Sequence, residues 1–230
     1  MKILALDTAT KSCSIAVVDK ESLLTEVTIA KEQTHSKHLM DIIDWVIGMS
    51  ALTISELDGF AVTKGPGTFT GLRIGISSAK GLAMAAGIPI VGVSSLEALA
   101  MQASLFPYLI CPFLDARRGE VYFSRYRFLK GRLKSEIEES VATPSEAVSD
   151  INEPCIFIGN GARLYHDSIL DKMGKLAHFA PFAQHTIRAS TVAFLGMDKF
   201  ENAEVDDGFT LSPHYIRKSD AELNRQKKKM

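Results

Sequence analysis

Short apolar runs alternate with turn residues over the first hundred positions of the chain. Three of these runs follow one another with brief polar connections, which predicts an antiparallel meander. Beyond the meander the hydrophobic pattern alternates between the period of a helix and a short buried run. The predicted elements are strands at 3–6, 13–18 and 22–30, a helix at 34–49, a strand at 60–63, a helix at 72–86, a strand at 89–93 and a helix ending near 104. Their order is β-β-β-α-β-α-β-α.

The second half of the chain repeats this order with negligible sequence identity. Its predicted elements are strands at 108–114, 121–128 and 133–141, a short helix opening at Thr143-Pro144, a strand at 155–158, a helix to about 175, a strand at 176–179 and a helix at 188–202. Asp7 and Asp115 follow the leading strands of the two halves. We therefore expect an α/β protein of two βββαβαβα units with a cleft between them. The expected division is 1–104, 105–216 and a basic tail at 217–230.

A glycine-rich turn joins the strand at 60–63 to the helix at 72–86. Free N–H groups at such a helix start can hold an anion. The spacing of Gly65, Gly67 and Gly71 misses the dinucleotide pattern by one residue, and no Lys-Ser or Lys-Thr pair follows, so the phosphate-loop pattern also fails. Small residues recur every four positions from Gly71 to Gly87. That stripe predicts close approach of another backbone, either within the fold or from a second molecule.

The helix at 35–49 is apolar around most of its circumference. One stripe follows helical spacing, and Met40 and Trp45 lie off it. Either the fold encloses this helix or one side packs on a partner; the second interpretation is favoured because an aromatic anchor with Met is typical of interface centres. The residues expected at a partner or dimer interface are Leu39, Met40, Ile43, Trp45, Val46, Ile47, Leu72, Gly75, Ile76, Ala79, Leu82 and Ala83.

Two carboxylates are candidates for chemistry at the cleft. If Asp7 and Asp115 face it, they could hold a metal or orient water in a nucleotide-dependent phosphotransferase. Asp is equally a turn residue that bonds its own backbone. The possible cleft residues are Asp7, Thr8, Gly65, Gly67, Thr68, Asp115 and Arg117.

The histidine and cysteine patterns give weaker evidence for a functional site than the two carboxylates do. His35 and His38 share a helix face with Asp41 and could chelate a metal, although a solvated surface is the simpler interpretation. Cys13, Cys111 and Cys155 lie far apart, which fits neither a disulfide framework nor a zinc spacing and suits a reducing compartment. No Ser-His-Asp or Cys-His arrangement is evident.

The composition limits the classes of protein to which the chain can belong. The 230 residues are 46% hydrophobic with a net charge of −1, which indicates an ordinary globular protein and argues against a surface that grips nucleic acid throughout. No signal sequence and no apolar run of about 20 residues is present, so we expect a cytoplasmic protein without a membrane span. Residues 217–230 carry six basic and two acidic side chains. They are either a solvated terminus or a weak contact to RNA phosphate.

Several motifs together resemble the TsaB (YeaZ) family, subunits required for threonylcarbamoyladenosine formation in tRNA. The motifs are Ile3-Leu-Ala-Leu-Asp-Thr-Ala-Thr10, Lys64-Gly-Pro-Gly-Thr-Phe-Thr-Gly-Leu-Arg-Ile-Gly75, Ser78-Ala-Lys-Gly-Leu82, Leu114-Asp-Ala-Arg-Arg-Gly-Glu-Val-Tyr122 and Pro213-His-Tyr-Ile-Arg217. The resemblance implies the duplicated fold of actin, sugar kinases and Hsp70 (the ASKHA or RNase H-like fold). It also implies a related partner, TsaD, and an ATPase, TsaE, with tRNA bound through the complex and a homodimer when the subunit is alone.

The chain departs from TsaD where that partner holds its catalytic metal. A His-x-x-x-His segment of TsaD corresponds here to Val93-Ser-Ser-Leu-Glu-Ala-Leu99, which has no histidine. The nearest match to the adenosine-binding segment is Gly159-Asn-Gly-Ala-Arg163. The resemblance thus implies a non-catalytic subunit without metal or cofactor that supports TsaD in transferring a threonylcarbamoyl group to the adenosine next to the anticodon. The alternatives are the phosphotransferase and a peptidase, which would need a metal.

Overall fold

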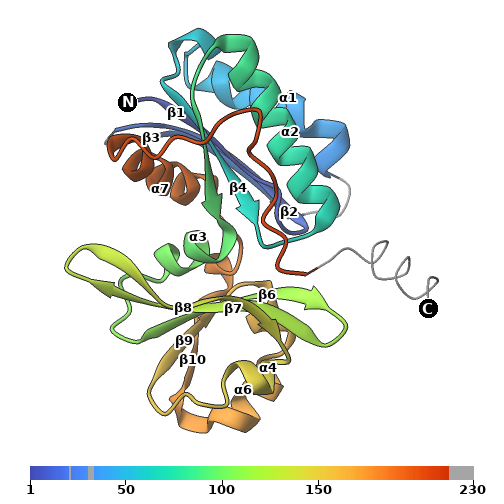
Figure 1. The fold of residues 1–230 in the computed structure, drawn as a ribbon, viewed down its shortest axis with the longest axis vertical. Helices are drawn as coiled ribbons and strands as arrows, with labels where there is room; N and C mark the ends of the chain where they lie inside the picture. The colour runs from blue at the N-terminus through green and yellow to red at the C-terminus, as the bar shows by residue number, and fades with distance from the viewer. Residues whose placement is uncertain (21, 31–33, 218–230) are drawn as a thin grey trace.

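The computed structural model describes residues 1–20, 22–30 and 34–217, without the side chains of 34–37. Within this described part the strands form two mixed sheets of five strands each (Figure 1). The predicted tail beyond Arg217 and the side chain of His35 lie outside the described residues.

The first sheet has the strand order β3-β2-β1-β4-β5. Its strands are β1 (Ile3–Asp7), β2 (Ser12–Asp19), β3 (Ser22–Ala30), β4 (Gly59–Gly65) and β5 (Ile90–Ser94). The first three strands form the predicted antiparallel meander, whereas β4 and β5 are added parallel to β1. Strand β3 therefore lies at the edge of the sheet.

The second sheet repeats this arrangement in the order β10-β9-β6-β7-β8. Its strands are β6 (Leu109–Arg117), β7 (Glu120–Leu129), β8 (Arg132–Ala142), β9 (Cys155–Ile158) and β10 (Ala177–Phe179). Strands β6, β7 and β8 pair antiparallel, and β9 and β10 run parallel to β6. The predicted duplication of a three-stranded meander is confirmed, and in each copy the two further strands run parallel to the first.

Helices form layers around the two sheets (Figure 1). Helices α1 and α2 lie side by side on one face of the first sheet, and α7 covers its other face. Helix α3 lies between the two sheets. Helices α4, α5 and α6 cover the far side of the second sheet. The bounds are α1 (Thr34–Met49), α2 (Phe69–Ala86), α3 (Ser95–Gln102), α4 (Pro144–Ala147), α5 (Asn160–Leu164), α6 (His166–Met173) and α7 (Ala189–Glu201). Short 3₁₀ turns occur at Ile54–Glu56, Gly174–Leu176 and Phe182–Gln184.

Local signals explain the helix ends. The Ser94 hydroxyl accepts hydrogen bonds from the N–H groups of Leu96 and Glu97, as expected of the cap that begins α3. Thr143 and Glu146 form the capping box of α4, with Pro144 in its first turn. Gly87 takes a left-handed conformation (φ 68°) and ends α2.

The predicted element boundaries differ from the structure at three helices. Helix α2 begins at Phe69 rather than 72, and α3 ends at Gln102 rather than near 104. The helix predicted to run to about 175 is two helices, α5 and α6, because Tyr165 between them leaves the helical conformation (φ −108°, ψ 25°).

Helix α7 comes last in the chain but packs on the first sheet. Its first residue, Ala189, donates its N–H to the Ser14 hydroxyl at 2.9 Å, and Glu26 of β3 accepts from the backbone N–H of Ser190 at 3.0 Å. Val192 and Ala193 are buried with residues of β1, β4 and β5. The predicted division at residue 104 follows chain order, whereas α7 belongs in space with the first sheet.

Candidate functional site

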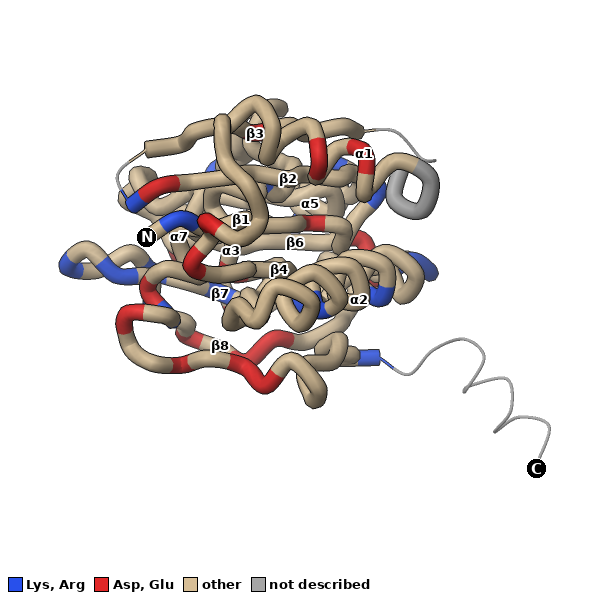
Figure 2. Tube along the Cα trace, turned by 90° about the horizontal axis from the view of Figure 1, so that it is seen from above, with Lys and Arg blue, Asp and Glu red and all other residues tan. Residues whose placement is uncertain are grey.

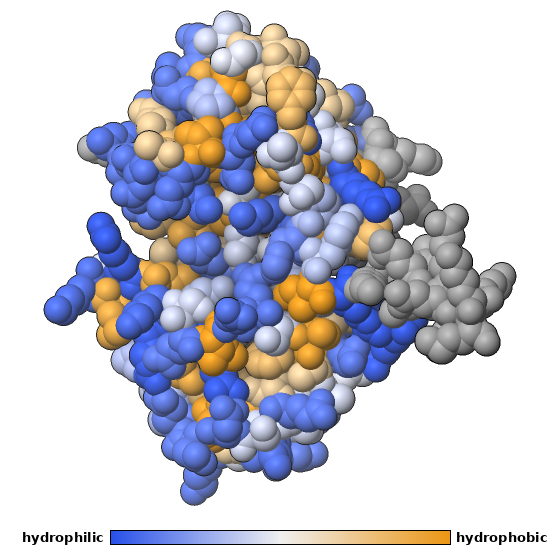
Figure 3. Space-filling view, viewed as in Figure 1, coloured by the Kyte–Doolittle hydropathy of each residue, from blue (hydrophilic) through white to orange (hydrophobic). Residues whose placement is uncertain are grey.

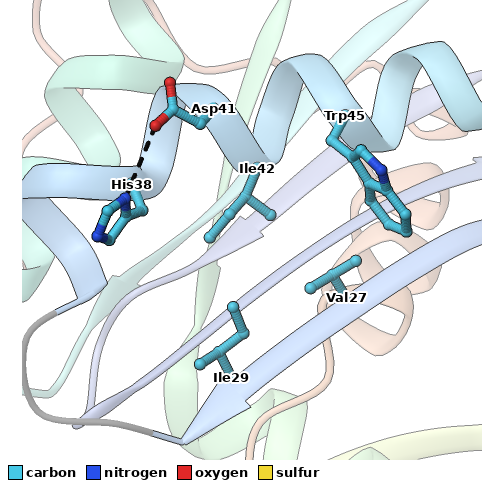
Figure 4. A pocket seen from close by; sticks show the side chains of 6 residues that line it. All are labelled: Val27, Ile29, His38, Asp41, Ile42 and Trp45. Atoms are coloured by element: carbon cyan, nitrogen blue, oxygen red, sulfur yellow. Dashed lines mark ion pairs between the residues drawn. The ribbon is translucent and has the colours of Figure 1, made fainter.

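An apolar groove opens between α1 and the edge strand β3 (Figure 4). Its volume is about 410 Å³, and we call it the α1 groove; it is lined by Val27, Ile29, His38, Asp41, Ile42 and Trp45. Val27 and Ile29 alternate along β3 and point toward α1, and Trp45 closes one end with 54% of its surface exposed. The groove forms because α1 crosses the sheet without covering the apolar side chains of its edge strand.

His38 and Asp41 stand at the other end of the groove. The Nδ1 atom of His38 lies 3.7 Å from Oδ2 of Asp41, and both side chains are exposed. Of the predicted His35, His38 and Asp41 set, the structure thus brings the last two together as a pair at the groove. Among the described residues no group of three or more His, Cys, Asp or Glu side chains is arranged to hold a metal ion.

The residues expected at a partner interface divide into two groups. Met40 and Trp45 are exposed (51% and 54%), and Leu82 is half-buried. The others lie in the core of this chain and offer almost no surface to a second molecule: Leu39, Ile43, Val46, Ile47, Leu72, Gly75, Ile76, Ala79 and Ala83. Their apolar stripes are therefore explained by packing on the first sheet.

The glycines of α2 serve a close approach within the fold. A Cβ atom at Gly71 would lie 2.0 Å from the carbonyl oxygen of Thr8, and one at Gly75 would lie 2.2 Å from the Thr8 hydroxyl. That hydroxyl donates a hydrogen bond to the Gly71 carbonyl at 2.7 Å. Of the two explanations for the small-residue stripe, contact within the chain accounts for these two positions.

The turn after β1 is closed under α2. Asp7 and Thr8 have no exposed surface, so the structure places them inside the protein rather than on an open cleft. One oxygen of Asp7, Oδ1, accepts from the Thr63 hydroxyl at 2.8 Å and from the N–H of Ala9 at 3.1 Å. Its other oxygen, Oδ2, has no hydrogen-bond partner within the described residues. Burial raises the pKa of Asp7 to about 7 against these two hydrogen bonds.

The glycine-rich turn packs on the same segment. Thr68 donates its N–H to the carbonyl of Ala9 at 2.7 Å, and a Cβ atom at Gly67 would lie 2.4 Å from that oxygen. Gly65 has φ 118° and faces the carbonyl of His214. These three residues, proposed from sequence for a cleft, hold the turn, α2 and the chain's last described segment together.

Asp115 and Arg117 lie at the equivalent turn of the second unit. Oδ1 of Asp115 accepts the backbone N–H of Arg117 at 2.8 Å, and Asn160 accepts the backbone N–H of Asp115 at 3.1 Å. Asp115 is half-buried and Arg117 is exposed. Asp115 thus makes the turn contact that was one of its two sequence interpretations, and it lies on a different sheet from Asp7.

Sequence reasoning missed a polar cluster between the two units. The Ser94 hydroxyl donates to Glu139 of β8, whose other oxygen lies 3.4 Å from Nε2 of His214. The His214 backbone N–H donates to the Lys64 carbonyl at 2.6 Å. Burial raises the pKa of Glu139. No signal in the sequence marks this cluster, because its members come from four separate segments.

A pocket of about 270 Å³ adjoins this cluster. Its lining is mostly polar: Lys64, Asp206, Thr210, Leu211, Ser212, Pro213 and His214. Most of these residues belong to residues 206–217, which we call the C-terminal strap because they cross from the first sheet to the second unit beside α2 (Figure 1). The predicted Pro213–Arg217 motif is the last part of this strap.

The chain matches the family model described as TsaD, tRNA N6-adenosine threonylcarbamoyltransferase, over residues 23–225. It is 35% identical to the tRNA threonylcarbamoyladenosine biosynthesis protein TsaB of Bacillus subtilis over 96% of each chain. It is 28% identical to the protein of that name from Haemophilus influenzae over 94% of each.

A solved structure shares the fold. YeaZ from Pseudomonas aeruginosa superimposes with a TM-score of 0.80 over 93% of this chain and 99% of that one, at 24% identity. The architecture is the duplicated fold of the actin, sugar kinase and Hsp70 superfamily, as expected from the sequence. No helix in the described ranges is long and apolar enough to cross a bilayer. With this fold and full-length similarity to curated relatives, the chain belongs to the TsaB family of tRNA threonylcarbamoyladenosine biosynthesis proteins.

Proposed function

We propose that this chain is a non-catalytic subunit that binds a TsaD-type transferase. In that complex it supports transfer of a threonylcarbamoyl group to the tRNA adenosine next to the anticodon. The observation that carries the proposal is the α1 groove, where Trp45 stands exposed beside the apolar side chains of Val27 and Ile29 in β3. A half-exposed Trp at the mouth of an apolar groove is typical of the centre of a protein interface.

The family to which the chain belongs supports the choice of partner. Because the chain matches a model of TsaD itself, a TsaD-type partner shares its fold and carries counterparts of α1 and α2. Two related subunits can meet through equivalent surfaces, as two identical subunits do about a two-fold axis. The docking surface is thus the exposed side of α1 and α2, including Met40, Trp45 and Leu82, and the buried residues of both helices support it from beneath.

The non-catalytic role is supported by what occupies the position of the partner's metal ligands. In this chain Ser94 caps α3 and bonds Glu139, while Leu96 and Leu99 are fully buried in the core. Asp7, which a phosphotransferase would need, is enclosed beneath α2. These side chains make contacts within the fold of the chain itself.

Two further expectations concern the assembly of the subunit. Alone, the chain would form a homodimer through the exposed side of α1 and α2, and the transferase would replace the second copy. TsaE enters only through the family resemblance, as the ATPase that joins the assembly.

Calorimetric titration of the TsaD-type partner into this chain tests the proposal. Trp45→Ala should weaken binding by about 30-fold or more, since truncation of a central aromatic residue costs about 2 kcal/mol or more. The matched control is Phe182→Ala, which truncates an aromatic residue that is 82% exposed on the second unit. It should bind like the unaltered chain. Equal affinities for both variants, or no binding by the unaltered chain, would contradict the proposal.

A further inference from the structure

The C-terminal strap ends on an aromatic stack at the start of α2. The rings of Phe69 and Tyr215 lie parallel, with centroids 4.2 Å apart and planes inclined by 10°. The Arg73 guanidinium lies 4.2 Å from the centre of the Phe69 ring, and its Nε donates to the Tyr215 hydroxyl at 3.0 Å. These three residues, which we call the Arg73 platform, hold a cation and an aromatic surface in one fixed arrangement.

Among the described residues, no carboxylate neutralises the charge of Arg73. Its contacts are the two rings, and within the described part of the chain no Asp or Glu oxygen lies in ion-pair distance of it. One of its five N–H donors is used within the described residues, which leaves four for a ligand. Tyr215 stacks on Phe69 with one ring face and keeps 37% of its surface exposed. The platform is thus open to solvent.

A second arginine site lies at the β6–β7 turn. Arg117 and Arg118 adopt left-handed backbone conformations (φ 61° and 56°), followed by Gly119 (φ 80°). Non-glycine residues rarely adopt this conformation, which costs free energy. The exposed Arg117 has no Asp or Glu oxygen within ion-pair distance among the residues that the structure describes.

The strap joins these two sites on one edge of the molecule. Arg217, two residues beyond Tyr215, contacts Glu120 at 2.7 Å and the carbonyl of Ala116 at 3.4 Å, next to Arg117. Figure 2 shows Lys and Arg along the edge where α2 begins, beside the start of the grey C-terminal trace. Figure 3 shows strongly hydrophilic residues over much of this face of the molecule.

We propose that this edge binds an unpaired strand of the tRNA, with a base stacked on the Arg73 platform and a phosphate held by Arg117. Single-stranded RNA is recognised by aromatic and guanidinium planes that stack on splayed bases, combined with cations that track the backbone. An anionic lipid or an acidic peptide uses only the charges, whereas the stacked rings suit a base. The inference rests on the proposed function, which brings tRNA to the complex.

Salt-dependent RNA binding tests this surface. The complex with the transferase, and this chain alone at low salt, are titrated with an unmodified tRNA transcript at several salt concentrations. Arg73→Gln and Arg117→Gln should each weaken binding about tenfold and lower the slope of log affinity against log salt by about one. Tyr215→Leu should weaken binding about tenfold with the slope unchanged, because it removes stacking without removing charge.

The controls separate this edge from other sources of binding. Arg132→Gln removes the same charge from the exposed end of the β7–β8 hairpin and should leave affinity and slope unchanged. Removal of residues 218–230 should leave the effects of Arg73→Gln and Tyr215→Leu intact. If the tail removal abolishes binding while the platform variants bind normally, or if Arg132→Gln matches Arg73→Gln, the inference is wrong. Calorimetry with the transferase reports the proposed function separately, because Arg117 and Tyr215 lie outside α1 and α2, so Arg117→Gln and Tyr215→Leu should leave affinity for the transferase unchanged.

Discussion

The two units carry the same turn after their leading strands, yet one turn is closed and the other is open. Asp7 lies beneath α2 with no exposed surface, whereas Asp115 is half-buried and the hairpin beyond it exposes Arg117. In both units a glycine at a helix start approaches the leading strand. Gly71 faces the carbonyl of Thr8, and Gly161 would place a Cβ atom 2.9 Å from the carbonyl of Phe113.

The length of the helix that follows accounts for the difference. Helix α2 has 18 residues and continues over the turn, with Gly75 against the Thr8 side chain. Helix α5 has five residues and ends at Leu164, so the second turn keeps an exposed tip. In a duplicated fold, one copy of a turn can thus be buried in the core while the other copy stays exposed and available for binding.

The closed turn should be the more sensitive to added volume. Gly71→Val would force side-chain atoms into the backbone of Thr8, where a Cβ atom alone would lie 2.0 Å from the carbonyl oxygen. We expect the free energy of unfolding, measured in urea, to fall by about 4 kcal/mol or more. Gly81→Ala, in the same helix with no atom within 4 Å, should raise it by about 0.5–1 kcal/mol. Similar losses of stability in the two variants would contradict this prediction.

The carboxyl group buried at the closed turn should make stability depend on pH. Burial raises the pKa of Asp7 to about 7 in the folded chain, from an ordinary value of 3.8, so the folded state favours the protonated acid. Its contribution to stability is therefore complete below pH 3.8 and is lost as pH rises through about 7, a change of up to about 4 kcal/mol.

Asp7→Asn removes this charge but keeps an acceptor for Thr63 and Ala9. Urea unfolding at about pH 5 and about pH 8 should therefore show a smaller loss of stability in the variant than in the unaltered chain. Parallel pH profiles would show that Asp7 is not the group responsible.

At the open turn, the backbone conformation of Arg117 should affect the free energy of unfolding more than the burial of its side chain does. Arg117 has φ 61°, a region in which Asn is enriched among non-glycine residues. Arg117→Asn should raise the free energy of unfolding by about 0.5–1 kcal/mol, whereas Arg117→Ala keeps an unfavourable conformation and should not. Thermal unfolding of the two variants measures the difference. An equal change in both would mean that the arginine side chain, not its backbone, sets stability here.

Local patterns in the sequence were sufficient for most of the fold. Strand β3 and helix α1 have the predicted bounds, and Ser94 and Thr143 begin α3 and α4 as their capping chemistry indicates. The duplicated order of strands followed from short connections and apolar runs. The break at Tyr165 was missed because neither Gly nor Pro marks it.

Contacts between distant segments could not be read from those patterns. Helix α7 was expected to follow its own half, but Ser14 and Glu26 hold its start on the first sheet. The spacing of α1 placed Ile43 on its apolar stripe and Trp45 off it, and the structure buries the first and exposes the second. Val27 and Ile29 complete the groove from a strand that sequence analysis never connected with a site.

The placement of α7 bears on how the protein is made. A ribosome synthesises the first sheet early, but the helix that covers one of its faces emerges only near the end of translation. Until then Ala61 and Val91, both fully buried in the finished protein, lack the Gly196 backbone that packs against them. One apolar face of the first sheet therefore stays uncovered in the nascent chain until α7 has been synthesised.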